Sequence, residues 1–171
     1  MADAERLSAE DEPYHREPIT YEAPYLDNLP TAPREKFAAN IAAIQKLKEI
    51  EQRVANGGSP AFEDEQKILA QYTGWGGLSD AFDPNKSTWS NEYSQLKAAL
   101  SESEYEAARS STLTAFYTPA TVIHPIYRAL ERFGVKGGKI LEPSMGTGAF
   151  LAHGHFGSSD AKFYGVELDS I

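Results

Sequence analysis

A glycine-containing turn between a short apolar strand and a helix constrains the fold of this chain most strongly. Residues 139–142 have the pattern of a short buried strand, and a loop with Gly146 and Gly148 leads into a helix from about Ala149. Residues 162–168 form a second apolar stretch. The order strand, loop, helix, strand is a βαβ unit, which predicts a parallel sheet and an α/β fold.

Helices are expected upstream of this unit, because apolar residues recur there at spacings of three and four. Phe37, Ile41 and Ile44 form one such stripe, which Asn56 and the two glycines after it bring to an end. The expected helices span residues 33–54, 60–72, 90–100, 102–110 and 119–133.

Polar residues mark the expected starts of three helices. Ser59 and Thr118 each precede a proline and are the predicted N-caps of the helices at 60–72 and 119–133. Ser101 and Glu104 have the spacing of a capping box. Gly134 ends the helix at 119–133. The apolar face of this helix comprises Val122, Ile123, Ile126, Tyr127, Leu130 and Phe133.

The segment Gly74-Trp75-Gly76-Gly77 is unsuited to a helix interior. It predicts a tight turn that holds a large aromatic ring and packs helices together. The first 30 residues carry repeated prolines among acidic residues, which indicates an extended or disordered arm. We therefore expect three parts: the arm at 1–30, a helical segment at 31–112 and an α/β part at 113–171.

Charge and residue content exclude several function classes. The formal net charge of -9 makes the chain a poor non-specific nucleic-acid binder, so any DNA contacts are expected mainly outside it. The absence of cysteine excludes a disulfide scaffold, a Cys-ligated zinc site and a Cys nucleophile. It also fits a reducing compartment, so we expect a cytoplasmic protein. No long apolar run or signal-peptide pattern occurs, so no membrane association is expected.

The loop after the first strand is the main candidate for ligand binding. The strand ends in Glu142 and Pro143, and the chain then turns through Gly146 and Gly148 into a helix. Glycines let the backbone approach a ligand closely, and a helix start offers free N–H groups. The loop lacks the third glycine of a dinucleotide fingerprint and the Lys-Ser/Thr pair of a P-loop. An ordinary βα turn is the alternative.

Two further segments strengthen the ligand hypothesis. Glu167 lies near the end of the second strand, about 20 residues after the loop, where an acidic residue accepts the hydroxyls of a ribose. Residues 116–119, Phe-Tyr-Thr-Pro, precede the helix before the first strand. Taken alone, the second segment is better explained as a plain N-cap.

Together these segments resemble the adenine-N6 branch of DNA methyltransferases. Residues 116–119 are similar to motif X, residues 141–150 to motif I and residues 166–169 to motif II of that family. The resemblance implies the first βαβ unit of a Rossmann-like class I methyltransferase domain that binds S-adenosyl-L-methionine. Thr118 and the motif I loop would hold the methionine end, Glu167 the ribose, and Glu142 the loop and the cofactor's amino group. The cofactor-binding residues implied are Tyr117, Thr118, Pro119, Glu142, Pro143, Ser144, Met145, Gly146, Thr147, Gly148, Phe150, Glu167 and Leu168.

The upstream part resembles a narrower group. Residues 68–78, 81–83 and 111–119 are similar to the N-terminal region of very large methyltransferase–helicase proteins of phages, plasmids and conjugative elements. This likeness covers about residues 34–171. It implies that the partners are DNA, bound mainly by regions outside this chain, and the C-terminal methyltransferase and helicase regions.

One element of that family does not occur in the sequence. Adenine-N6 enzymes read the flipped base with an Asn/Asp-Pro-Pro-aromatic motif, and none is present. Two predicted strands also fall short of the family's sheet and would leave a strand edge exposed. We therefore expect an incomplete domain, with no catalytic residue of its own and no methyl-transfer activity alone.

Two alternative functions fit the same residues. The chain is alternatively a non-catalytic binding or decoy module with a vestigial cofactor loop, or a different Rossmann-like nucleotide binder. His153 and His155 have a spacing that can bind metal, but no acidic cluster lies near them in sequence. We therefore expect no metal site.

Overall fold

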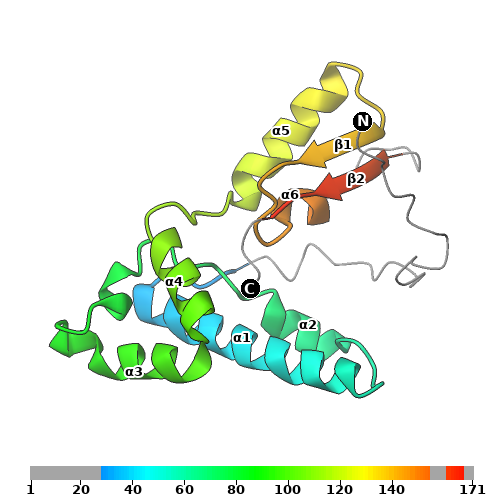
Figure 1. The fold of residues 1–171 in the computed structure, drawn as a ribbon. Coiled ribbons are helices and arrows are strands. Elements are labelled where there is room, and N and C mark those ends of the chain that lie inside the picture. Colours follow the sequence, from blue (N-terminus) through cyan, green and yellow to red (C-terminus); the bar gives the residue numbers. More distant parts are fainter. Residues whose placement is uncertain (1–27, 155–160, 168–171) are drawn as a thin grey trace, which may run out of the picture.

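The computed structural model describes residues 28–154 and 161–167 of the chain. In Figure 1, helices α1 to α4 form one body, and α5, α6 and the two strands form a second one beside it. The predicted arm falls outside the described residues up to residue 27. The elements are α1 (Pro33–Ala55), α2 (Glu63–Leu69), the 3-10 turns η2 (Ser79–Phe82) and η3 (Ser87–Trp89), α3 (Ser90–Ala99), α4 (Glu102–Ser111), α5 (Ala120–Arg132), β1 (Gly138–Glu142), α6 (Ala149–Ala152) and β2 (Ala161–Gly165).

Helix α1 confirms the prediction for residues 33–54 almost residue for residue. Pro33 occupies its first turn, where the missing N–H leaves no bond unmade. Gly57 follows the C-cap with a φ of +79°, a backbone angle that glycine adopts without strain. The buried face includes Phe37 and Ile44, so the predicted stripe faces the core.

The predicted second helix is wrong at both ends. Ser59 does not cap it and Pro60 does not open it, since α2 starts at Glu63 with Phe62 in the N-cap position. The helix also stops at Leu69, before the predicted end at residue 72. The preference of Ser59 for the N-cap position therefore did not decide where this helix begins.

An arginine from α1 explains the later start of α2. The Arg53 guanidinium donates to the carbonyls of Ser59 (2.9 Å) and Pro60 (3.1 Å) and to both oxygens of Glu65. The Glu65 carboxylate in turn accepts the N–H of Phe62 at 2.9 Å. These bonds hold the chain before Phe62 outside the helix, and they satisfy the helix start through Glu65.

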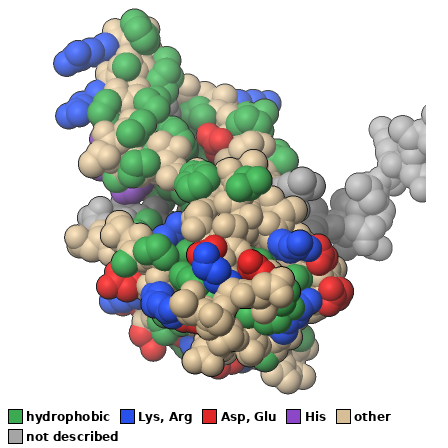
Figure 2. Space-filling model, turned by 90° about the vertical axis from the view of Figure 1, so that its left-hand side faces the viewer, with side chains coloured by type: hydrophobic (Ala, Val, Ile, Leu, Met, Phe, Trp, Pro, Cys, Tyr) green, Lys and Arg blue, Asp and Glu red, His purple; other side chains and the backbone are tan. Residues whose placement is uncertain are grey.

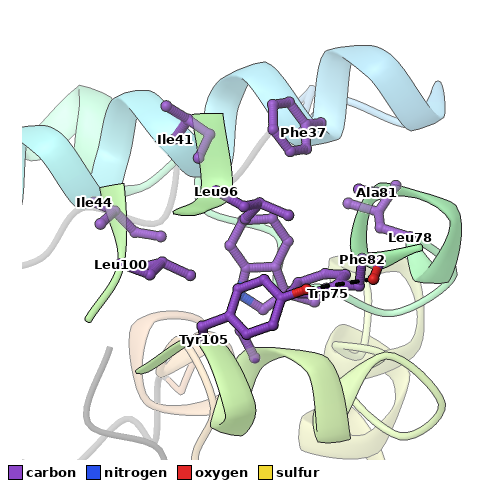
Figure 3. Packing of buried hydrophobic residues seen from close by; sticks show 11 residues of the cluster. Phe37, Ile41, Ile44, Trp75, Leu78, Ala81, Phe82, Leu96, Leu100 and Tyr105 are labelled. Atoms are coloured by element: carbon purple, nitrogen blue, oxygen red, sulfur yellow. Dashed lines mark hydrogen bonds between the residues drawn. The ribbon is translucent and has the colours of Figure 1, made fainter. Parts of the chain in front are cut away.

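Trp75 lies at the centre of the helical body and confirms the predicted role of the Gly-Trp-Gly-Gly turn in packing helices together. Its side chain is fully buried, and its ring meets those of Phe37 at 6.2 Å, Tyr72 at 6.4 Å and Phe82 at 5.4 Å, each edge to face. Figure 3 shows the ring between the α1 side chains and Tyr105 of α4. One buried aromatic thus joins α1, η2 and α4.

Helix α4 begins as predicted. Ser101 is its N-cap and accepts the N–H of Glu104 at 3.3 Å, while the Glu104 carboxylate accepts the N–H of Ser101 at 2.6 Å. This capping box satisfies two donors that the helix start would otherwise leave unpaired. It also fixes where α4 starts relative to the end of α3.

Helix α5 corrects the prediction that Thr118 is its cap. Pro119 is the N-cap, with an extended backbone, and its carbonyl accepts the N–H groups of Val122 at 2.9 Å and Ile123 at 3.2 Å. Thr118 therefore lies one residue before the cap. Gly134 follows the helix with a φ of +84°, in accord with the predicted stop.

The two strands confirm the predicted parallel pairing, but β1 is not buried as expected, since Leu141 is 61% exposed. Strands β1 and β2 are hydrogen-bonded in parallel, with Ile140 opposite Phe163, and α6 lies between them in sequence. Strand β2 ends at Gly165, earlier than the predicted residue 168, which lies outside the described residues. The chain is thus an α/β protein with one small βαβ unit.

Only part of the predicted apolar face of α5 is buried. Ile123 and Tyr127 form a second core, against which Ile140 and Phe163 of the sheet pack. Phe133 is 84% exposed, and Val122 and Ile126 are also exposed, which corrects the prediction for these three. Figure 2 shows hydrophobic side chains gathered on the surface of the body that contains α5. One two-stranded sheet is too narrow to cover the whole face.

Candidate functional site

Backbone bonds tie the glycine loop after β1 to the end of β2. The N–H of Val166 donates to the carbonyl of Glu142, and the N–H of Met145 donates to that of Val166, both at 2.9 Å. The N–H of Gly146 donates to Oε2 of Glu167 at 2.7 Å. The loop and the acidic residue that follows β2 are therefore one hydrogen-bonded unit at the carboxyl end of the sheet.

The Glu142 side chain also holds this loop through a hydrogen bond. Its Oε1 accepts the N–H of Ser144 at 3.3 Å, two residues further along the chain. The side chain of Met145 packs against Gly165, where an added Cβ would lie 2.1 Å from Sδ. The absence of a side chain at Gly165 lets Met145 lie this close to the end of β2.

A pocket opens beside this unit. It has a volume of about 420 Å³, within the range of about 300–1,000 Å³ that small-molecule sites occupy. One wall comes from the end of α4 and the segment after it, and the other from the glycine loop and Glu167. The lining residues are Ala107, Ser110, Ser111, Thr114, Ala115, Phe116, Tyr117, Ser144, Gly146 and Glu167.

The charge of the lining selects against anions. Among the described lining residues, Glu167 is the one acidic side chain, and none is Lys or Arg. The remaining polar groups are hydroxyls and backbone groups. A phosphate placed here would meet the Glu167 carboxylate, so these residues favour a neutral or cationic ligand rich in hydroxyl groups.

Four of the residues implied by the family resemblance line this pocket: Tyr117, Ser144, Gly146 and Glu167. None of the other described ones is among the lining residues. Glu142 and Met145 fix the loop as described above, and Thr118 and Pro119 lead from Tyr117 into α5. Pro143, Thr147 and Gly148 belong to the same loop, whereas Leu168 lies outside the described residues.

Phe150 lies away from the pocket. It packs on the second core with Tyr127, whose hydroxyl donates to the carbonyl of Phe150 at 2.6 Å. Burial raises the pKa of Tyr127 above its ordinary value, so the phenol stays a donor. This pair anchors α6 to α5 and holds the far end of the glycine loop.

The wall formed by α4 was not anticipated from the sequence. The pocket is lined by Ala107, Ser110, Ser111 and Thr114, although these residues precede the loop by at least 29 positions. Small and hydroxyl-bearing residues on a helix end carry no pattern that predicts a binding site. Only the packing of the helical body against the βαβ unit brings them there.

A pair of histidines joins α5 to the residue that follows α6. Nε2 of His124 on α5 is 3.1 Å from Nδ1 of His153, which follows α6 and is buried. His155 lies outside the described residues. In residues 28–154 and 161–167 no group of three or more His, Cys, Asp or Glu side chains is arranged to hold a metal ion.

Comparisons with known proteins identify no relative of this chain. No family model matches the chain, and searches of curated proteins and of solved structures find no significant match. Across the part of the chain that the structure describes, every helix is too short or too polar to cross a membrane. Since no match was found, the interpretation of the site rests on its geometry and chemistry.

Proposed function

We propose that this chain forms the S-adenosyl-L-methionine-binding part of a Rossmann-like DNA adenine-N6 methyltransferase. One observation carries the proposal. Gly146 of the glycine loop donates to the Glu167 carboxylate, and both residues line the same pocket. A carboxylate and a close-approaching loop at the carboxyl ends of parallel strands are the groups that a nucleoside ligand requires there.

An adenosyl ligand fits the polar groups of this pocket. An ionised carboxylate offers about four acceptor sites, so Glu167 can accept ribose hydroxyls while it keeps the bond from Gly146. The carboxylate also favours the positively charged sulfonium of the cofactor. Tyr117 and Ser144 stand beside these groups and would line the methionine end.

A dinucleotide fits less well. Pyrophosphate sites rely on a helix start that points several N–H groups at the phosphates. Helix α6 has 4 residues, and no Lys or Arg lies among the described lining residues to balance a phosphate charge. The pocket therefore favours the methyl donor over a nicotinamide or flavin dinucleotide.

The roles of this chain in the reaction are binding and alignment. The cofactor, when bound, supplies an electrophilic methyl group. Glu167 and the loop would orient the nucleoside, and the wall from α4 would keep water from one side of it. Since no Asn-Pro-Pro-aromatic motif occurs in the sequence, we assign the reading of the target adenine to other regions, together with most DNA contacts.

Calorimetry on the full chain tests the binding proposal. S-adenosylhomocysteine should bind, and Glu167→Ala should weaken it at least about tenfold, which corresponds to about 1.4 kcal/mol. Glu131→Ala, which removes an exposed carboxylate from α5, is the matched control and should leave the affinity unchanged. Tighter binding of NAD than of S-adenosylhomocysteine would refute the assignment. A folded chain that binds neither would support a non-catalytic module instead.

A second experiment tests whether recognition of the target adenine requires regions outside this chain. When the chain alone is incubated with labelled S-adenosylmethionine and adenine-containing DNA, it should transfer no label to the DNA. Clear incorporation would show that these residues suffice for base reading and would overturn the assignment of that step to other regions.

A further inference from the structure

The ring of Tyr117 is enclosed by two glycines from different parts of the chain. A Cβ added at Gly74 would lie 2.9 Å from Cε2 and 3.0 Å from Cζ of this ring, and one added at Gly146 would lie 2.7 Å from Cε1. Gly74 belongs to the Gly-Trp-Gly-Gly turn of the helical body, and Gly146 to the ligand loop. The two contacts fall on different edges of the ring.

The helical body holds its glycine turn firmly. Asn40 of α1 is fully buried, and its Nδ2 donates to the carbonyl of Gly74 at 2.7 Å while its Oδ1 accepts the N–H of Thr73 at 2.8 Å. Nζ of Lys36 donates to the carbonyl of Gly76 at 2.8 Å. The position of Gly74 is thus set by α1, so Tyr117 rests on a rigid support.

The same turn carries the segment that leads to Tyr117. An added Cβ at Gly76 would lie 2.2 Å from the carbonyl oxygen of Ala115, a distance that only glycine permits. The N–H of Gly77 donates to the carbonyl of Thr112 at 3.0 Å. Backbone therefore lies against backbone on both sides of the turn, and this contact aligns residues 112–117 along the pocket.

We propose that Gly74 is a positioning residue of the ligand pocket. It sets the place of Tyr117 from the helical side, as Gly146 does from the loop side, so that the helical body and the βαβ unit form a single binding site. The turn then has two roles: it buries Trp75 in the core, and it shapes one wall of the pocket. The identity of the ligand rests on the proposed function, whereas the contact between Gly74 and Tyr117 does not.

A matched pair of substitutions tests the contact. Gly74 and Gly77 both have a left-handed φ, +68° and +78°, so alanine strains the backbone at either position. At Gly77 the nearest atom to the added Cβ, Cε1 of Phe116, is 3.9 Å away. Gly74→Ala should therefore lower Tm by at least about 3 °C more than Gly77→Ala does.

A mutant cycle shows whether the extra loss acts through the ring. In the Tyr117→Ala background the ring is absent, so Gly74→Ala and Gly77→Ala should lower Tm by the same amount. Should Gly74→Ala alone fail to fold, the double variant Gly74→Ala/Tyr117→Ala should fold again, because the ring that the added Cβ would meet is then absent. An extra loss that persists without the ring would overturn the proposal.

Ligand affinity gives a readout that a purely structural role would not move. At a temperature where both variants are folded, Gly74→Ala should weaken S-adenosylhomocysteine binding at least about fivefold relative to Gly77→Ala. Equal affinities would overturn the positioning role. If the unmodified chain does not bind this ligand, the proposed function fails, and the Tm cycle still decides whether Gly74 positions Tyr117.

Discussion

Removal of the Asn40 side chain should destabilise the helical body far more than its size suggests. Asn40 has no solvent exposure, and its amide forms bonds to Gly74 and Thr73 that no other side chain provides in the described structure. Asn40→Ala leaves the buried Gly74 carbonyl and the half-buried Thr73 N–H unpaired. At about 1–3 kcal/mol for each buried unpaired group, the expected loss is about 3 kcal/mol. This is a large share of the 5–15 kcal/mol that stabilises a typical domain.

Urea denaturation followed by tryptophan fluorescence measures this loss, because Trp75 belongs to the affected turn. Asn56→Ala is the control: Asn56 is exposed and its Nδ2 donates to the carbonyl of Gln52 at 2.9 Å, so its removal should cost less than about 1 kcal/mol. The midpoint should shift without a change in the slope m. A loss below about 1 kcal/mol for Asn40→Ala would refute the argument that Asn40 holds the turn.

Asn40→Asp sharpens the test through its pH dependence. The new oxygen that replaces Nδ2 would face the Gly74 carbonyl, so the folded state favours a protonated carboxyl and raises its pKa above the unfolded value of about 3.9. A raised folded pKa contributes stability at pH values below the unfolded pKa, and that stability is lost as the pH rises through the folded pKa. The variant should therefore be more stable, relative to the unmodified chain, at pH 4 than at pH 7.

Three further outcomes are expected. The Arg53 guanidinium and the N–H of Phe62 lower the pKa of Glu65 from 4.5 to about 2, so this carboxylate stabilises the fold above pH 4.5 and ceases to do so as the pH falls towards 2. Arg53→Met should weaken this acid dependence in pH-dependent denaturation, and an unchanged dependence would contradict the pairing. Pro125 lies inside α5 and lacks an N–H, so Pro125→Ala should stabilise the chain by about 1–3 kcal/mol in urea; a destabilisation would show that the ring packs usefully. Phe133→Ser should change stability by less than about 0.5 kcal/mol because the ring is 84% exposed, whereas a larger loss would indicate that this surface is covered in solution.

Elements set by neighbouring residues were predictable. The capping box of Ser101 and Glu104, the first-turn position of Pro33 and the stop at Gly134 all appear where the sequence places them. Each depends on contacts within about four residues, so the sequence pattern contains all the partners. The parallel pairing of β1 and β2 followed in the same way, because a βαβ order leaves little topological choice.

The start of α2, which depends on residues outside the helix start, was not predictable from the sequence. Ser59 is a good N-cap by type, but Arg53 on α1 binds its carbonyl and that of Pro60 and moves the helix start to Glu63. The Thr118 prediction failed for a local reason instead, since the carbonyl of Pro119 accepts the N–H groups of Val122 and Ile123. In the first case a long-range charge interaction outweighs a local hydrogen bond worth about 1 kcal/mol.

The sequence by itself determined that a carboxylate-bearing strand turns through glycines into a helix, and that an acidic residue follows the next strand. It did so because strand, turn and helix preferences are local. Only the tertiary structure decided that Gly146 bonds to Glu167, that α4 supplies the opposite wall, and that Gly74 reaches Tyr117. A glycine in a sequence serves a turn and a close approach equally well, and the neighbour that requires the missing Cβ becomes known only when the chain is folded.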